Sequence, residues 1–181
     1  MSHNYPWLCR APDGQENGGV AVKVFDREPF YLTTASETQE YLDRVFTEEE
    51  KEGFLSVDFQ IVRNDEAAMD NILSIGLDYT SGYGALLWYC DGAFSEEVAA
   101  ISGAEVAEHV WVSRNPSPPE ADPRVVCDPW NPSYFNRVSV IALDGVRPVV
   151  EEYFRESTGL RPAGVEWVKG HFTGELYEEN E

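Results

Sequence analysis

The central part of the sequence contains three consecutive runs of residues that are typical of β-strands. These runs are FLSVDFQIVR (54–63), NILSIGLDYT (71–80) and YGALLWYCD (83–91). Each run is rich in β-branched or aromatic residues, and the SGYG segment around Gly82 joins the last two at the distance of a hairpin turn. Because a tight turn reverses the chain, the three runs predict an antiparallel meander.

A helix is predicted to begin after Thr34, upstream of these strands. Thr34 is followed three residues later by Glu37, and this spacing fits a capping box. The segment that follows places apolar side chains on one side and acidic ones elsewhere, which is the pattern of a helix lying on a sheet. The apolar side chains are Tyr41, Leu42, Val45 and Phe46. We expect the helix to end near Thr47 or Gly53.

A second amphipathic helix is predicted after Val138. Asp144 is its expected N-cap, and Pro148 can be tolerated in or near the first turn. Gly159 supplies the C-terminal stop, and Pro162 follows it. The apolar residues at helical spacing are Val146, Val149, Val150, Tyr153 and Phe154.

The chain then extends from Ala163 to Lys169 as a short strand. Alternation places Val165 and Trp167 on one face and Glu166 and Val168 on the other. Large aromatic side chains dominate core burial, so Trp167 is expected to pack under the second helix. Glu166 is expected to point toward solvent or a partner.

Two further strand-like runs flank the meander, VAVKVFD (20–26) and HVWVSR (109–114). The predicted fold class is therefore α+β, a mostly antiparallel sheet of about five to six strands with two main helices packed on one face. A chain of 181 residues suits one domain. We expect an N-terminal arm (1–19) rich in Pro, Gly and Asn, an α+β domain (20–169) and an acidic C-terminal tail (170–181).

The charge of the chain is strongly unbalanced. There are 33 acidic residues against 13 basic ones, a net charge of -20, whereas small soluble domains usually carry a net charge of about 2 to 8 in magnitude. Such a surface repels nucleic acid and anionic membranes, so direct contact with either is not expected, and it attracts a basic macromolecule. Colloidal solubility or a salt-rich cytoplasm would also account for the excess of acids.

Several functional classes lack a signature in this sequence. No continuous apolar run approaches the roughly 18 residues of a membrane span, and the start lacks the blocks of a signal peptide, so a cytoplasmic location is expected. Cys9, Cys90 and Cys127 show no CxxC or Cys/His grouping, so no metal site is expected. The absence of GxSxG, P-loop and dinucleotide motifs argues against an enzyme, and we expect no catalytic residues and no cofactor.

Residues 114–136 (RNPSPPEADPRVVCDPWNPSYFN) hold six of the eleven prolines. This density of proline excludes regular helix and central strand across most of the segment. A long ordered loop is often functional, so the segment is a candidate contact surface. Together with the predicted hairpin and final strand it supplies the expected partner-binding residues, which are the aromatic residues Tyr79, Tyr83, Trp130 and Tyr134 and the acidic residues Asp78, Glu120, Asp128 and Glu166.

Two quoted stretches carry a resemblance to a known family. NILSIGLDYTSGYGALLWYCDG (71–92) and LDGVRPVVEEYFRESTGLRPAGVEW (143–167) resemble the first-numbered immunity protein family of bacterial polymorphic toxin systems, over roughly residues 20–169. The most specific part is the ending, where an amphipathic helix is followed by a glycine, an Arg-Pro turn and a strand closing in Val-Glu-Trp. The loop SPPEADPRVVCDPWNPS (117–133) and the acidic tail depart from the family pattern.

This resemblance implies an α+β fold, no enzymatic activity and a role in neutralising a cognate toxin domain. Toxins of such systems are often nucleic-acid deaminases or nucleases, which hold a polyanionic substrate in a basic groove. An acidic binder with aromatic anchors suits such a basic partner. The alternative is an acidic nucleic-acid mimic or adaptor that binds a basic housekeeping partner. An antitoxin rescues growth from one toxin, whereas a mimic inhibits several DNA-binding proteins.

Overall fold

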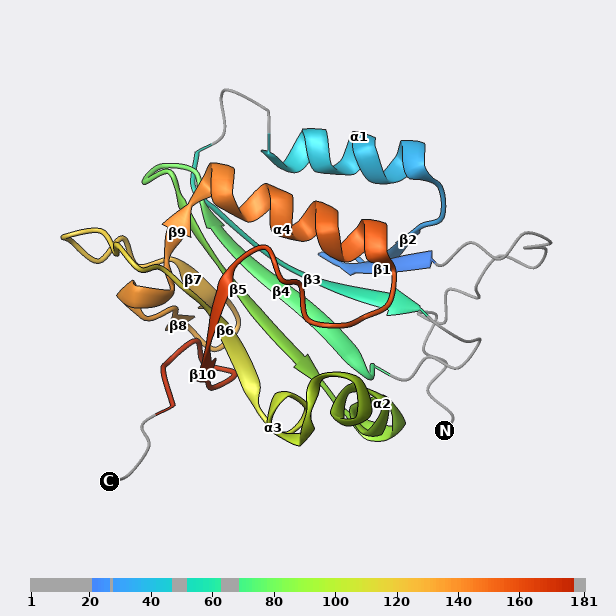
Figure 1. The fold of residues 1–181 in the computed structure, drawn as a ribbon. Coiled ribbons are helices and arrows are strands. Elements are labelled where there is room, and N and C mark those ends of the chain that lie inside the picture. The colour runs from blue at the N-terminus through green and yellow to red at the C-terminus, as the bar shows by residue number, and fades with distance from the viewer. Residues whose placement is uncertain (1–20, 27, 47–51, 63–68, 178–181) are drawn as a thin grey trace, which may run out of the picture.

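An eight-stranded sheet forms the centre of the computed structural model, which describes residues 21–26, 28–46, 52–62 and 69–177. Its strands are β1 (Ala21–Phe25), β2 (Phe30–Leu32), β3 (Phe54–Val62), β4 (Asn71–Asp78), β5 (Tyr83–Cys90), β6 (Val110–Arg114), β9 (Ile141–Ala142) and β10 (Glu166–Gly170). They pair antiparallel in the order β10-β6-β5-β4-β3-β1-β2, with β9 added to β5 (Figure 1). The predicted α+β class and the antiparallel meander β3-β4-β5 are confirmed, and the sheet has more strands than the five to six expected.

Some expectations fall on residues that the structure does not describe. These are the N-terminal arm (1–19), the expected helix end at Thr47, and the last four residues of the tail (178–181). They stay predictions.

Two long helices, α1 (Ala35–Phe46) and α4 (Leu143–Glu156), lie side by side on one face of the sheet (Figure 1). The predicted capping box of α1 is present, because the Glu37 backbone N–H donates to Thr34 Oγ1 at 3.2 Å and the Thr34 N–H donates to Glu37 Oε2 at 3.0 Å. The helix–sheet core includes Leu42 of α1 and Val149 of α4. Amphipathic periodicity therefore identified both helices and the faces that they bury.

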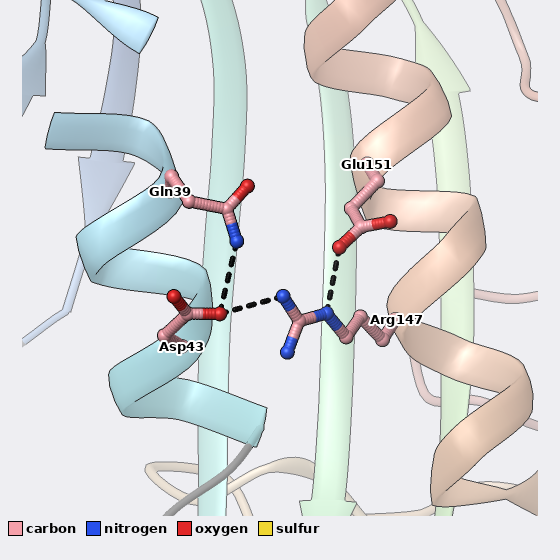
Figure 2. A network of polar contacts seen from close by, with 4 residues as sticks. All are labelled: Gln39, Asp43, Arg147 and Glu151. Carbon is pink, nitrogen blue, oxygen red and sulfur yellow. Dashed lines mark hydrogen bonds and ion pairs between the residues drawn. The ribbon is translucent and has the colours of Figure 1, made fainter. Parts of the chain in front are cut away.

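A polar network joins the outer sides of these two helices (Figure 2). Arg147 of α4 donates through Nη2 to Asp43 of α1 at 2.6 Å and through Nε to Glu151 at 2.6 Å. Gln39 also donates to Asp43, at 2.9 Å. The hydrogen bond from Arg147 is the main reason that the pKa of Asp43 is lowered. The network fixes the two helices relative to each other on the solvent side, although exposed ion pairs contribute little stability.

The ends of α4 differ from the sequence-based expectation. Ala142, and not Asp144, is the N-cap residue, and Pro148 lies inside the helix in its second turn. The helix ends because Ser157 adopts a left-handed conformation (φ 51°), and the Ser157 hydroxyl donates to a backbone carbonyl of the last turn. Gly159, the predicted stop, follows two residues later with φ 80° and packs against Asn71.

Several short elements were not predicted. They are the helices α2 (Gly92–Ser102), α3 (Ala104–Ala107) and η1 (Arg137–Ser139), and the strands β2, β7 (Val126–Asp128), β8 (Ser133–Tyr134) and β9. The α2 helix buries only Phe94 and Val98, so its apolar stripe is weak in the sequence. Its start is fixed by the Asp91 side chain, which accepts from the Gly92 N–H at 2.7 Å. No helix among the described residues is both long and apolar enough to cross a membrane.

The proline-rich segment covers the face of the sheet opposite α1 and α4. Successive residues of β5 point to opposite faces, so Leu86 lies in the helix–sheet core and Leu87 lies in a second core. The second core is completed by Val125 and Phe135 of the proline-rich segment, which are almost fully buried. This segment is therefore a structural layer of the fold, with β7 and β8 as a separate two-stranded sheet.

Candidate functional site

The β7–β8 hairpin is fastened to the sheet at its base. The Ser56 hydroxyl of β3 donates to the Cys127 carbonyl at 3.1 Å. On β4, a Cβ atom at Gly76 would lie 2.2 Å from the Val126 carbonyl oxygen, so the absence of a side chain at Gly76 lets the hairpin backbone approach the sheet. These two contacts hold β7 across β3 and β4.

The turn of this hairpin is closed by one aspartate. Asp128 Oδ1 accepts the Trp130 backbone N–H at 2.8 Å and the Asn131 N–H at 3.2 Å. Pro129 and Pro132 restrict the backbone on either side of these residues. Because the turn is already ordered, a partner that binds it has little conformational entropy to remove.

The hairpin presents two aromatic side chains to solvent. Trp130 is 93% exposed, the largest value among the exposed large apolar residues of the described chain. Tyr134 is 36% exposed, and the Arg124 guanidinium lies 4.0 Å from its ring centroid. Burying a tryptophan of about 200 Å² is worth roughly 5 kcal/mol before the costs of association. An exposed tryptophan on a rigid turn therefore has the properties of a binding hot spot.

Acidic groups accompany the hairpin. Glu120 is exposed in the same proline-rich segment, and Asp128 is half-buried. Under the hairpin, burial raises the pKa of Asp58, a hydrogen bond from Ser74 opposes this shift, and the negative charge of Asp128 adds to it. Burial is thus the main reason that Asp58 holds its proton more strongly than an exposed aspartate, and the charge of Asp128 is a smaller cause.

The residues predicted at the β4–β5 turn have local roles. Asp78 Oδ1 accepts the backbone N–H groups of Thr80 and Ser81, at 2.9 and 3.3 Å. The Tyr79 hydroxyl donates to the Val45 carbonyl at the end of α1, at 3.0 Å. Tyr83 is half-buried against the second core. The structure therefore places these three residues in the scaffold, with part of each still accessible.

The last predicted contact, Glu166, is exposed at the start of the edge strand β10, opposite Arg114 in register. Its neighbour Trp167 packs against the helix–sheet core, and the Trp167 indole N–H donates to the Pro162 carbonyl at 2.7 Å. Val168 contacts the second core. The predicted alternation of this strand is confirmed. The eight predicted residues thus divide among the β7–β8 hairpin, the loop before it, the β4–β5 turn and β10.

Sequence reasoning missed Phe172, which is 61% exposed and packs edge-on against Tyr89 with 4.8 Å between ring centroids. It lies in the expected acidic tail, whose residues 171–177 fold back onto β10 through the Tyr177 N–H, which donates to the Lys169 carbonyl at 3.0 Å. The acidic composition of the tail gives no indication that residues 171–177 are ordered. No periodic pattern in these few residues could have revealed it.

The described residues offer little for catalysis or metal binding. Burial raises the pKa of Cys90 to about 11 and that of Cys127 to about 12, so both thiols stay protonated near neutral pH. Within the described ranges, no group of three or more His, Cys, Asp or Glu side chains could hold a metal ion. The exposed hairpin is therefore the feature that best fits a function in binding.

Comparison with known proteins identifies the family. The model of Immunity protein Imm1 matches residues 26–169, which is well over half of the chain. No curated protein and no solved structure matches the chain. The family match confirms the resemblance that the strand and helix motifs carry. The chain therefore belongs to the Imm1 family of immunity proteins, which neutralise a cognate toxin and are not enzymes.

Proposed function

We propose that this immunity protein neutralises a cationic toxin that acts on nucleic acid, a deaminase or a nuclease, and that it binds this toxin through the β7–β8 hairpin. The observation that carries the proposal is the 93% exposure of Trp130 on a turn held by Asp128. Tryptophan is enriched among the residues that dominate binding energy at protein interfaces, and a partner that covers a tryptophan on an ordered turn loses little conformational entropy. The proposed site of action is the cytoplasm.

The net charge of -20 supports a cationic partner. An enzyme that acts on nucleic acid has a basic groove for the phosphate backbone. Attraction between opposite surface potentials raises the rate of encounter, and packed aromatic side chains slow dissociation. Fast capture and long residence are both needed when the partner is lethal to the cell.

The hairpin contributes most to the proposed interface. Trp130 and Tyr134 are the anchors, Glu120 supplies negative charge, and Asp128 fixes the turn that carries Trp130. The remaining expected contacts, Asp78, Tyr79, Tyr83 and Glu166, stay predictions, and the local hydrogen bonds of Asp78 and Tyr79 already account for those two side chains.

Replacing Trp130 by alanine tests the proposal. Because the side chain is almost fully exposed, Trp130→Ala should leave the free energy of unfolding nearly unchanged. It should weaken binding of the cognate toxin domain about 30-fold or more, mainly through faster dissociation. The measurements are biolayer interferometry and rescue of growth when toxin and variant are co-expressed.

The outcomes separate the competing explanations. If wild-type protein rescues growth but Trp130→Ala binds as tightly as wild type, the hairpin is not the interface. If the wild-type protein instead inhibits several unrelated DNA-binding proteins and ignores the toxin, a general acidic mimic is the better description. A toxin domain without a basic nucleic-acid site would contradict the proposed toxin class.

A further inference from the structure

The C-terminal segment 171–177 lies directly against the base of the β7–β8 hairpin. The Cys127 thiol donates to the Phe172 carbonyl at 3.4 Å, and the Asn136 N–H donates to the Gly174 carbonyl at 3.0 Å. Gly174 has φ 82°, and a Cβ atom there would lie 3.1 Å from Cys127 Cβ. Segments that are about 40 residues apart in the sequence therefore form one continuous surface.

Phe172 is held in a defined position although most of its side chain is exposed. One edge of the ring packs on Tyr89 of β5, with the ring planes at 83°. Two hydrogen bonds hold the backbone around Phe172. The His171 N–H donates to the Glu175 carbonyl at 2.9 Å, and the Tyr177 N–H donates to the Lys169 carbonyl at 3.0 Å. Phe172 is thus a fixed aromatic side chain that is 61% exposed, and Trp130 is a more exposed one whose backbone is fixed by Asp128.

We propose that the hairpin and the segment 171–177 form a single toxin-binding surface, with Phe172 as a second aromatic anchor beside Trp130. This inference rests on the proposed function. Only two residues lie between Cys127, which contacts Phe172, and Trp130, so the chain limits the distance between the Cα atoms of Cys127 and Trp130 to about 11 Å. Four of the exposed large apolar side chains of the described chain belong to these two touching segments, Trp130, Tyr134, Phe172 and Tyr177.

The chemistry of the surface favours a cationic protein as its occupant. Glu175 is exposed within the C-terminal segment, and Glu120 is exposed in the loop that leads to the hairpin. A second copy of this chain would bring the same net charge of -20 and would be repelled. An aromatic centre with acidic groups beside it matches a partner that has an apolar pocket rimmed by Lys or Arg. We therefore assign the surface to the toxin and not to a homodimer.

The test compares two apolar residues of equal exposure. Phe172 and Ile101 are each 61% exposed, and Ile101 lies on α2, away from the hairpin. Phe172→Ala should raise the dissociation rate of the cognate toxin domain about tenfold, whereas Ile101→Ala should change it less than about twofold. Biolayer interferometry gives the rates, and a thermal unfolding scan of each variant checks the fold.

Two charge-reversal variants provide a second test, which remains informative if Phe172→Ala loosens the C-terminal segment. Glu175→Lys and Glu96→Lys change the net charge equally, and Glu96 is exposed on α2. Glu175→Lys should weaken toxin binding at least about fivefold more than Glu96→Lys, because only the former places a cation within the surface. Analytical ultracentrifugation of the wild-type protein should show a monomer.

The results distinguish failure of this inference from failure of the proposed function. If the wild-type protein binds and neutralises the toxin but Phe172→Ala and Glu175→Lys behave like their α2 counterparts, the composite surface is wrong and the hairpin proposal stands. If the wild-type protein does not bind the toxin, the proposed function fails as well. A wild-type dimer that Phe172→Ala dissociates would assign the surface to a second copy.

Discussion

Asp78 and Asp128 each end a strand at a hairpin, and in both the carboxylate accepts backbone N–H groups two and three residues later in the chain. The sequence predicts both residues as charged contacts with a partner. Their hydrogen bonds show that each first serves to shape a turn. What differs is the side chain that the turn carries, because the turn closed by Asp128 presents an almost fully exposed tryptophan.

A comparison of substitutions at these two positions separates charge from geometry. Asp128→Asn keeps an oxygen that can accept the Trp130 N–H, so it should retain most of the toxin affinity, whereas Asp128→Ala should lose about tenfold because the turn is no longer fixed. Asp128→Ala and Asp78→Ala should each lower the free energy of unfolding by about 1 kcal/mol. Asp78→Ala should lower the toxin affinity less than Asp128→Ala. Isothermal titration calorimetry and urea unfolding measure the two quantities. Equal losses for Asp128→Asn and Asp128→Ala would show that charge matters and turn geometry does not.

At the scale of elements, the placement of the proline-rich segment depends on small contacts that composition does not reveal. Its prolines predict the lack of helix and of central strand, and this prediction is confirmed by a segment whose regular structure is limited to β7 and β8. Its position over β3 and β4 depends on Gly76 and Ser56, which belong to a different part of the chain. Such long-range complementarity has no signature within either segment.

Two glycine substitutions test this docking. A methyl group at Gly76 would collide with the Val126 carbonyl oxygen, so Gly76→Ala should lower the free energy of unfolding by about 1–3 kcal/mol and displace the hairpin. Gly145 lies within α4, and a Cβ atom there would only touch Ile141 at 3.7 Å, so Gly145→Ala should stabilise the protein by about 0.5–1 kcal/mol. Urea unfolding gives both values. A neutral Gly76→Ala would mean that β7 does not pack as closely in solution.

At the scale of the whole molecule, charge acts over longer distances than any single contact. The net charge of -20 arises from acids in helices and loops alike, and under the proposed function it raises the rate of encounter with a cationic toxin before any side chain is buried. The aromatic anchors act only after the two proteins are in contact. The association rate should therefore depend on ionic strength, whereas the dissociation rate should depend on the aromatic side chains.

Stopped-flow binding at two ionic strengths tests this separation. Raising the salt concentration from about 50 to 500 mM should lower the association rate constant about tenfold or more, because screening weakens the attraction between the two surfaces. Trp130→Ala should leave this salt dependence unchanged while speeding dissociation. An association rate that is indifferent to salt would contradict electrostatic steering and would leave the family assignment intact.

The sequence by itself determined the elements whose signals are local and periodic. The meander of β3, β4 and β5, the amphipathic helices α1 and α4, and the opposite faces of Trp167 and Val168 all follow from the spacing of apolar residues. The same motifs carried the family resemblance, which the match over residues 26–169 confirms.

Only the tertiary structure decided which candidate residues are free to act. It assigned Asp78 and Tyr79 to hydrogen bonds within the scaffold, left Trp130 exposed and brought Phe172 against the base of the hairpin. The physical reason is that exposure and contact between distant segments depend on which surfaces the folded chain covers. A local pattern predicts a residue's element and face, but it does not specify what packs on that face.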